Sequence, residues 1–182
     1  MRTRAPTSLL QGLTPIANPD AKVLILGSMP GAASLVAGQY YAHPQNRFWP
    51  FMGELVGALP SLTYPERVAR LAGAGIAVWD VIGRCRREGS LDSAIRDVEV
   101  NDFTGFLTTH MSVRTLLFNG IKAEATFARL VMPTLHEHGL AGRLRYRRLP
   151  STSPANASQP ATMKLAAWRE ALAEARVVPA HP

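Results

Sequence analysis

The chain has 182 residues, 47% of them hydrophobic, which predicts one globular domain over residues 1–182 with its own core. Twenty Lys and Arg against 13 Asp and Glu give a net charge of +7, which favours a polyanionic partner without requiring one. The single cysteine, Cys85, excludes an intrachain disulfide and argues against iron–sulfur clusters and zinc-dependent deaminases, so we expect no metal and no cofactor.

The first half of the chain predicts two strands. Residues 1–20 are rich in Pro, Thr and Ala, and we expect them to form a lead-in that lies on the surface. The apolar run 22–27 predicts a strand, because the following Pro30 and Gly31 cannot continue one. Apolar residues at helical spacing predict helices over 49–59 and 64–71. A second strand is expected over 75–80, and residues 83–99 are expected to be mostly loop, with a helical turn after Ser90.

The second half predicts two more strands. We expect a helix from Asn101 to about residue 110, a strand at 113–118, and helices at 122–131 and around 135–140. A basic strand over 144–149, a loop at 151–158 and a helix over 160–176 follow. Four strands alternating with helices predict a three-layer α/β/α sandwich around a mainly parallel four-stranded sheet. No apolar stretch reaches the length of a signal peptide or a membrane span, so we expect a cytoplasmic protein without a membrane partner.

Three loops should leave the same edge of this sheet, at 27–49, 80–90 and 150–158. Amide, hydroxyl and aromatic side chains at the carboxyl ends of parallel strands are typical of a ligand site. These side chains suggest a pocket for a flat polar ring.

Five sequence blocks resemble one known family. In order, GSMPG, QYYAHPQNRFW, VWDVIGRCRREGSLDSAI, LLFNGIKA and LPSTSPANAS are similar to blocks of the uracil-DNA glycosylase superfamily, and most similar to its hypoxanthine-DNA (deoxyinosine) glycosylases. The resemblance implies a monofunctional DNA glycosylase of base excision repair. Such an enzyme flips a deaminated base, hypoxanthine first, out of DNA and hydrolyses its N-glycosidic bond. We expect it to act as a monomer on DNA that contains a deaminated base.

The resemblance implies a catalytic role for Asn46, whose amide oxygen can hold a water without adding a charge. Related enzymes have a polar Asn or Asp where this chain has Ser28 and Met29, and Met29 cannot do that work. The alternative is that Asn46 caps the helix that follows it.

The expected base pocket combines aromatic and polar side chains. Phe48 is the candidate for stacking on the base, Tyr40 and Tyr41 for the walls, and Ser28 and Met29 for the lining. The segment that ends in Asp80 resembles the one that reads the base edge in this superfamily. A carboxylate accepts the N1–H of hypoxanthine and is repelled by N1 of adenine, although uracil also presents an N–H. Asp80 could instead cap the next turn.

The expected DNA contacts come from one loop and from arginines beside the pocket. Small polar residues in the loop suit phosphate contacts, and Ser151 stands where uracil-specific enzymes have His. No lysine stands in the predicted pocket loops, which argues against a Schiff-base lyase step. The arginines are also consistent with a solvated basic face. The candidates for DNA binding are Ser151, Thr152, Ser153, Pro154, Ala155, Asn156, Arg84 and Arg147.

Three other functions remain open. One is the same chemistry on uracil or xanthine, another is a catalytically silent DNA-binding domain, and the last is a hydrolase of small nucleotides. Binding through many phosphates weakens steeply with salt, which would separate DNA binding from nucleotide binding.

Overall fold

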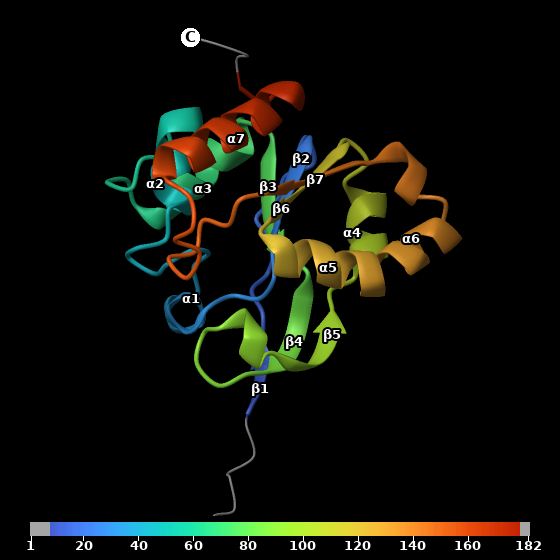
Figure 1. Ribbon diagram of the computed structural model, residues 1–182. Coiled ribbons are helices and arrows are strands. Elements are labelled where there is room, and N and C mark those ends of the chain that lie inside the picture. The colour runs from blue at the N-terminus through green and yellow to red at the C-terminus, as the bar shows by residue number, and fades with distance from the viewer. Residues whose placement is uncertain (1–7, 179–182) are drawn as a thin grey trace, which may run out of the picture.

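The computed structural model describes residues 8–178 and is built around a parallel four-stranded sheet (Figure 1). Its strand order is β3-β2-β6-β7, with β2 at Val23–Gly27, β3 at Ile76–Asp80, β6 at Thr115–Asn119 and β7 at Arg145–Leu149. All four strands are parallel, and β2 and β3 are buried along their whole length. Continuous burial is expected for strands covered on both faces, and the predicted sheet is confirmed.

Helices cover both faces of this sheet, which confirms the predicted three layers (Figure 1). On one side lie α2 (Phe48–Val56), α3 (Tyr64–Gly73) and α7 (Ala161–Glu174). On the other lie α4 (Phe103–Thr109), α5 (Ile121–Leu130) and α6 (Met132–Glu137). Large aromatic side chains fill the core between the layers, among them the fully buried Phe48, Phe127 and Trp168.

A second, antiparallel sheet with the order β1-β4-β5 was not predicted. It contains β1 (Leu9–Gln11), β4 (Ile82–Arg86) and β5 (Arg96–Val100), and the short helix η1 (Asp92–Ala94) precedes β5. The expectation of loop is therefore wrong for 83–86 and 96–99, whereas η1 agrees with the helical turn expected after Ser90. In β4 the buried Ile82 and Cys85 face a small core, whereas Arg84 and Arg86 are exposed and pair with acids of β5. The strand β4 was not recognised from the sequence because charged side chains occupy its solvent face and only some of its positions are buried.

The lead-in and the first long loop also have more structure than expected. β1 pairs with β4, and Ile16 forms a bridge with Val78 of the main sheet, so the described part of the lead-in is hydrogen-bonded to both sheets. The loop after β2 contains a short helix, α1 (Ala32–Ala37), and η2 (Ala141–Arg143) precedes β7. Within residues 8–178, no helix is long and apolar enough to cross a membrane.

Candidate active site

A cavity of about 660 Å³ opens at the carboxyl-terminal edge of the parallel sheet. The three predicted loops meet there, together with the β6–α5 connection and the turn between β4 and β5. The predicted residues that line it are Ser28, Met29, Tyr40, Tyr41, Asn46, Asp80, Ser151, Thr152, Ser153, Pro154, Ala155 and Asn156. Phe48, Arg84 and Arg147 are not among the lining residues.

Asp80 is a buried carboxyl group at the end of β3, with 4% of its surface exposed. It is paired in register with Gly27 of β2, and a Cβ at Gly27 would lie 2.4 Å from Asp80 Oδ1. Its Oδ2 has no hydrogen-bond partner. Burial, and to a smaller extent the negative charge of Asp92, raises the pKa of Asp80 to about 7, while Arg87 opposes the shift. The cavity therefore contains an acceptor whose charge changes near neutral pH.

Tyr41 lines the cavity and has a strained backbone. Its φ is 54°, a left-handed value that is unusual for a residue other than glycine. Its ring stacks on Phe48 with centroids 4.0 Å apart and an interplanar angle of 24°. Its hydroxyl is buried, and burial, followed by the negative charge of Asp80, raises its pKa, while the nearby Asn119 side chain opposes the shift. Strain of this kind often marks functional positions.

Phe48 lies beneath Tyr41 and is not exposed at all, so its expected position as the stacking ring of the pocket is corrected. It is the first residue of α2, and Trp49 and Trp168 pack edge-on against it, with centroids 5.0 and 6.1 Å away. Of these two stacked residues, only Tyr41 lines the cavity.

Tyr40 and His43 have local structural contacts. Only 3% of Tyr40 is exposed, and its hydroxyl donates to the carbonyl of Thr14, 3.0 Å away. His43 accepts a hydrogen bond at Nδ1 from the backbone N–H of Gln45, as in a turn. Tyr40 thus forms a wall of the cavity while anchoring the N-terminal segment.

Asn46 both lines the cavity and supports α2. Its Oδ1 accepts a hydrogen bond of 2.9 Å from the backbone N–H of Phe48, which resembles the capping role considered above. An amide oxygen has two lone pairs, so this bond leaves one acceptor position. The local role and a role in holding water are therefore compatible.

The 151–156 loop is held in place by three anchors. The backbone N–H of Arg47 donates to the carbonyl of Thr152 (3.0 Å), which joins this loop to the Asn46 loop. Asn119 and Thr152 exchange two hydrogen bonds of 2.9 Å. The buried Lys164 donates from Nζ to the carbonyl of Ser151 (2.8 Å) and to that of Asn156.

Sequence reasoning missed Asn119 and Lys122, which line the cavity, and the anchoring role of Lys164. Asn119 and Lys122 follow the carboxyl end of β6, so the rule that identified the other loops would also have found this one. The three predicted pocket loops contain no lysine, as stated above, but Lys122 reaches the cavity lining from a fourth segment that was not predicted. No comparable signal identified Lys164, which lies on the buried side of α7.

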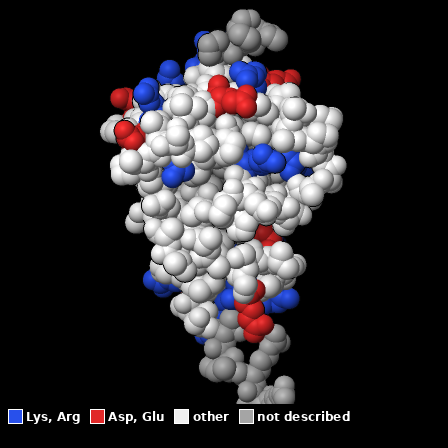
Figure 2. Space-filling view, turned by 90° about the vertical axis from the view of Figure 1, so that its left-hand side faces the viewer, with Lys and Arg blue, Asp and Glu red and all other residues white. Residues whose placement is uncertain are grey.

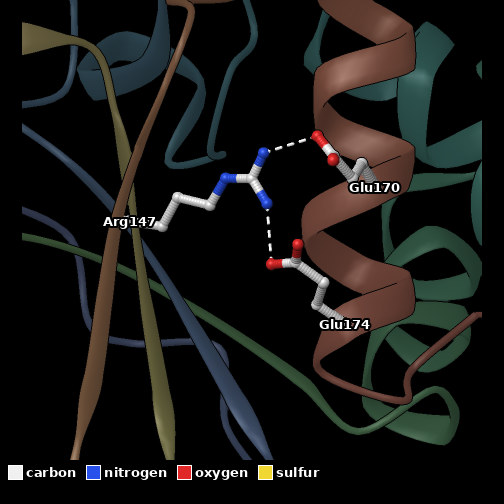
Figure 3. Close-up of polar contacts among 3 residues, drawn as sticks. All are labelled: Arg147, Glu170 and Glu174. Atoms are coloured by element: carbon white, nitrogen blue, oxygen red, sulfur yellow. Dashed lines mark hydrogen bonds and ion pairs between the residues drawn. The ribbon is translucent and has the colours of Figure 1, made fainter.

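The two predicted DNA-binding arginines lie away from the cavity lining and are paired within the chain. Arg147 reaches from β7 to α7, where it donates to Glu170 (2.6 Å) and Glu174 (2.7 Å) (Figure 3). Arg84 donates to Gln11 (2.7 Å) and lies 3.6 Å from Glu99. The structure therefore does not bring either arginine into the cavity, and their contact with DNA stays a prediction. The face in Figure 2 has a middle that is largely free of charged side chains, and both basic and acidic side chains are scattered around it.

A metal has no evident place in the described region. Across residues 8–178, no group of three or more His, Cys, Asp or Glu side chains could hold a metal ion.

Comparisons with known proteins agree with these features. The family model of the uracil DNA glycosylase superfamily matches residues 14–176. A protein of Methanosarcina acetivorans named hypoxanthine DNA glycosylase is 35% identical over 147 residues, 80% of this chain and 87% of the relative. One of the same name from Methanosarcina barkeri is 39% identical over 114 residues, 62% of this chain and 72% of the relative.

A solved structure is similar as well. The solution NMR structure of a candidate uracil DNA glycosylase from Methanosarcina acetivorans superposes with a TM-score of 0.75 and 31% identity. The match covers 93% of this chain and 99% of that chain. The chain therefore belongs to the uracil DNA glycosylase superfamily.

Proposed function

We propose that the chain is a monofunctional DNA glycosylase of base excision repair whose main substrate is hypoxanthine in DNA. The observation that carries this proposal is the buried Asp80, which lines the cavity with an oxygen that has no hydrogen-bond partner. The names of the two Methanosarcina relatives agree with it. We also propose that the protein is a single-domain monomer in the cytoplasm, and the uninterrupted match of the family model over residues 14–176 supports the single domain.

Base reading depends on the ionised form of Asp80. The carboxylate accepts the N1–H of a flipped hypoxanthine and is repelled by N1 of adenine, which is itself an acceptor. Protonated Asp80 carries both a donor and an acceptor, so it complements the edge of either base. Discrimination against adenine therefore requires that the carboxyl group has lost its proton.

Asn46 and Tyr41 would carry out the chemistry around the sugar and the base. The second lone pair of Asn46 Oδ1 holds a water, whose oxygen bonds to the anomeric carbon as the bond from that carbon to the base breaks. The electron pair of the broken bond leaves with the base, and one water proton goes to the base or to solvent. The Tyr41 ring, supported from below by Phe48, stacks on the flipped base.

The 151–156 loop would hold the DNA backbone next to the flipped nucleotide. Its serine and threonine hydroxyls and exposed backbone are suited to phosphate contacts. Lys164 and Asn119 keep the loop in one conformation without entering the duplex. Arg84 and Arg147, which do not line the cavity and are paired within the chain, are not needed for this role.

A second candidate substrate is uracil, because its N3–H is also a donor that Asp80 can accept. Alkaline-cleavage assays on end-labelled duplexes with one hypoxanthine, uracil or xanthine would rank the bases. Breaks at hypoxanthine should disappear in Asn46→Ala and persist in Gln45→Ala, a neighbouring exposed position that does not line the cavity. If the wild type binds these duplexes and cuts none, the protein is a DNA-binding domain without this activity.

A further inference from the structure

A second cavity lies at the opposite edge of the parallel sheet. It measures about 390 Å³ and is lined by the residues that we call the arginine pocket: Arg114, Thr115, Arg143, Arg145, Glu174, Ala175 and Arg176. Thr115 is the first residue of β6, whereas Asn119, at the active-site cavity, is the last. Arg145 likewise begins β7. The two cavities are therefore separated by the length of the strands, about 13 Å for five residues.

The positive charge of the arginine pocket is not neutralised by the chain. Arg114, Arg145 and Arg176 are exposed, and none of them forms an ion pair with an acid anywhere in residues 8–178. The one acid of the pocket, Glu174, accepts a hydrogen bond of 2.7 Å from Arg147, outside the pocket.

Arg143 adds a charge that is fixed in place. Its guanidinium donates to the backbone carbonyls of Leu107 (2.6 Å), Val113 (2.9 Å) and Met111 (3.1 Å). Burial, followed by the nearby charge of Arg114, lowers its pKa. Like charges gathered in this way repel one another, and a bound anion would relieve that repulsion.

The composition of the pocket favours a phosphate backbone over a protein partner. All four cations are arginines; the guanidinium of Arg143 is held by backbone carbonyls and contributes charge, whereas the planar forks of Arg114, Arg145 and Arg176 can match phosphate oxygens in pairs. The only apolar lining residue is the small Ala175, so the pocket offers no aromatic or large aliphatic anchor of the kind that dominates protein interfaces. DNA also surrounds the enzyme whenever it works.

We propose that the arginine pocket binds the phosphate backbone of a second DNA segment while the active site engages the first. This proposal rests on the DNA glycosylase function. Because the two sites lie at opposite edges of one sheet, the protein bridges two duplexes, which provides a route for transfer between segments without full release.

Native mass spectrometry with a short undamaged duplex tests this proposal by counting duplexes per protein. The wild type should bind two, and Arg114→Glu/Arg145→Glu should bind one, with the second affinity reduced at least about 10-fold. The control Arg70→Glu/Arg129→Glu makes the same change of charge at exposed helix positions outside both cavities and should still bind two. With about three phosphate contacts, the second affinity should fall roughly 40-fold between 50 and 200 mM salt.

Single-turnover cleavage of a hypoxanthine duplex separates failure of this proposal from failure of the glycosylase function. Cleavage should be unchanged in Arg114→Glu/Arg145→Glu, which also shows that the variant is folded. One duplex per wild-type protein, equal loss of the second duplex in both double variants, or two duplexes on Arg114→Glu/Arg145→Glu would each overturn the proposal. A wild type that cleaves nothing would instead overturn the glycosylase function.

Discussion

Replacing Asp80 by Asn should make the protein more stable at neutral and alkaline pH. The pKa of Asp80 is raised from 3.8 to about 7, mainly by burial, so the fold favours the neutral carboxyl group. A shift of this size corresponds to about 4 kcal/mol between the two protonation states. The contribution of the neutral form is complete below about pH 4 and is lost as the pH rises through 7.

Urea unfolding of the wild type and of Asp80→Asn across pH 4 to 8.5 measures this difference. The free energy of unfolding of the wild type should fall relative to that of the variant by up to about 4 kcal/mol over this range. Asp20→Asn, at an exposed position, should follow the wild type. Parallel curves for the wild type and Asp80→Asn would refute the reasoning, because they would mean that the carboxyl group is ionised in the fold at low pH.

Three further predictions concern the same cavity. Gly27→Ala places a Cβ 2.4 Å from Asp80 Oδ1, so it should displace the carboxylate. The single-turnover rate on hypoxanthine should then fall by about 10-fold or more, and an unchanged rate would contradict the base-reading role of Asp80. The rate ratio of hypoxanthine to adenine should rise between pH 6 and 8.5 as Asp80 loses its proton, and a ratio independent of pH would argue against Asp80 as the reader. Lys164→Met should leave the carbonyl of Ser151 without its donor, so the free energy of unfolding measured by chemical denaturation should fall by about 1–3 kcal/mol. DNA binding should weaken as well, and an unchanged DNA affinity would show that this anchor is not needed for function.

The parallel sheet and most of its cavity could be predicted because their signals are local. Apolar runs that stop at Gly27, at Asp80 and near Asn119 mark strand ends, and the carboxyl ends of parallel strands meet at one edge. The antiparallel sheet could not be predicted in the same way. Its strand β4 carries exposed arginines, and its edge strand comes from the lead-in, whose pairing is a tertiary contact.

Which of the two stacked aromatic residues lines the cavity could not be predicted from the sequence, for a different reason. Tyr41 and Phe48 are both suited to stacking on a base, and only the left-handed backbone of Tyr41 and the packing of Phe48 against Trp168 decide which ring faces the cavity. Arg147 illustrates the same limit, since its direction depends on where α7 packs. Charge in the sequence therefore predicts the presence of a cation and not its partner.

The most direct test of the account is to identify the products released from a duplex that contains one hypoxanthine. Mass spectrometry should detect free hypoxanthine in amounts equal to the abasic strand, and the strand should stay unbroken until alkali is added. Free base accompanied by immediate strand breaks would contradict the monofunctional mechanism and would indicate Lys122, which lines the cavity, as the amine that forms a Schiff base. Absence of free hypoxanthine with a folded, DNA-bound protein would contradict the central claim.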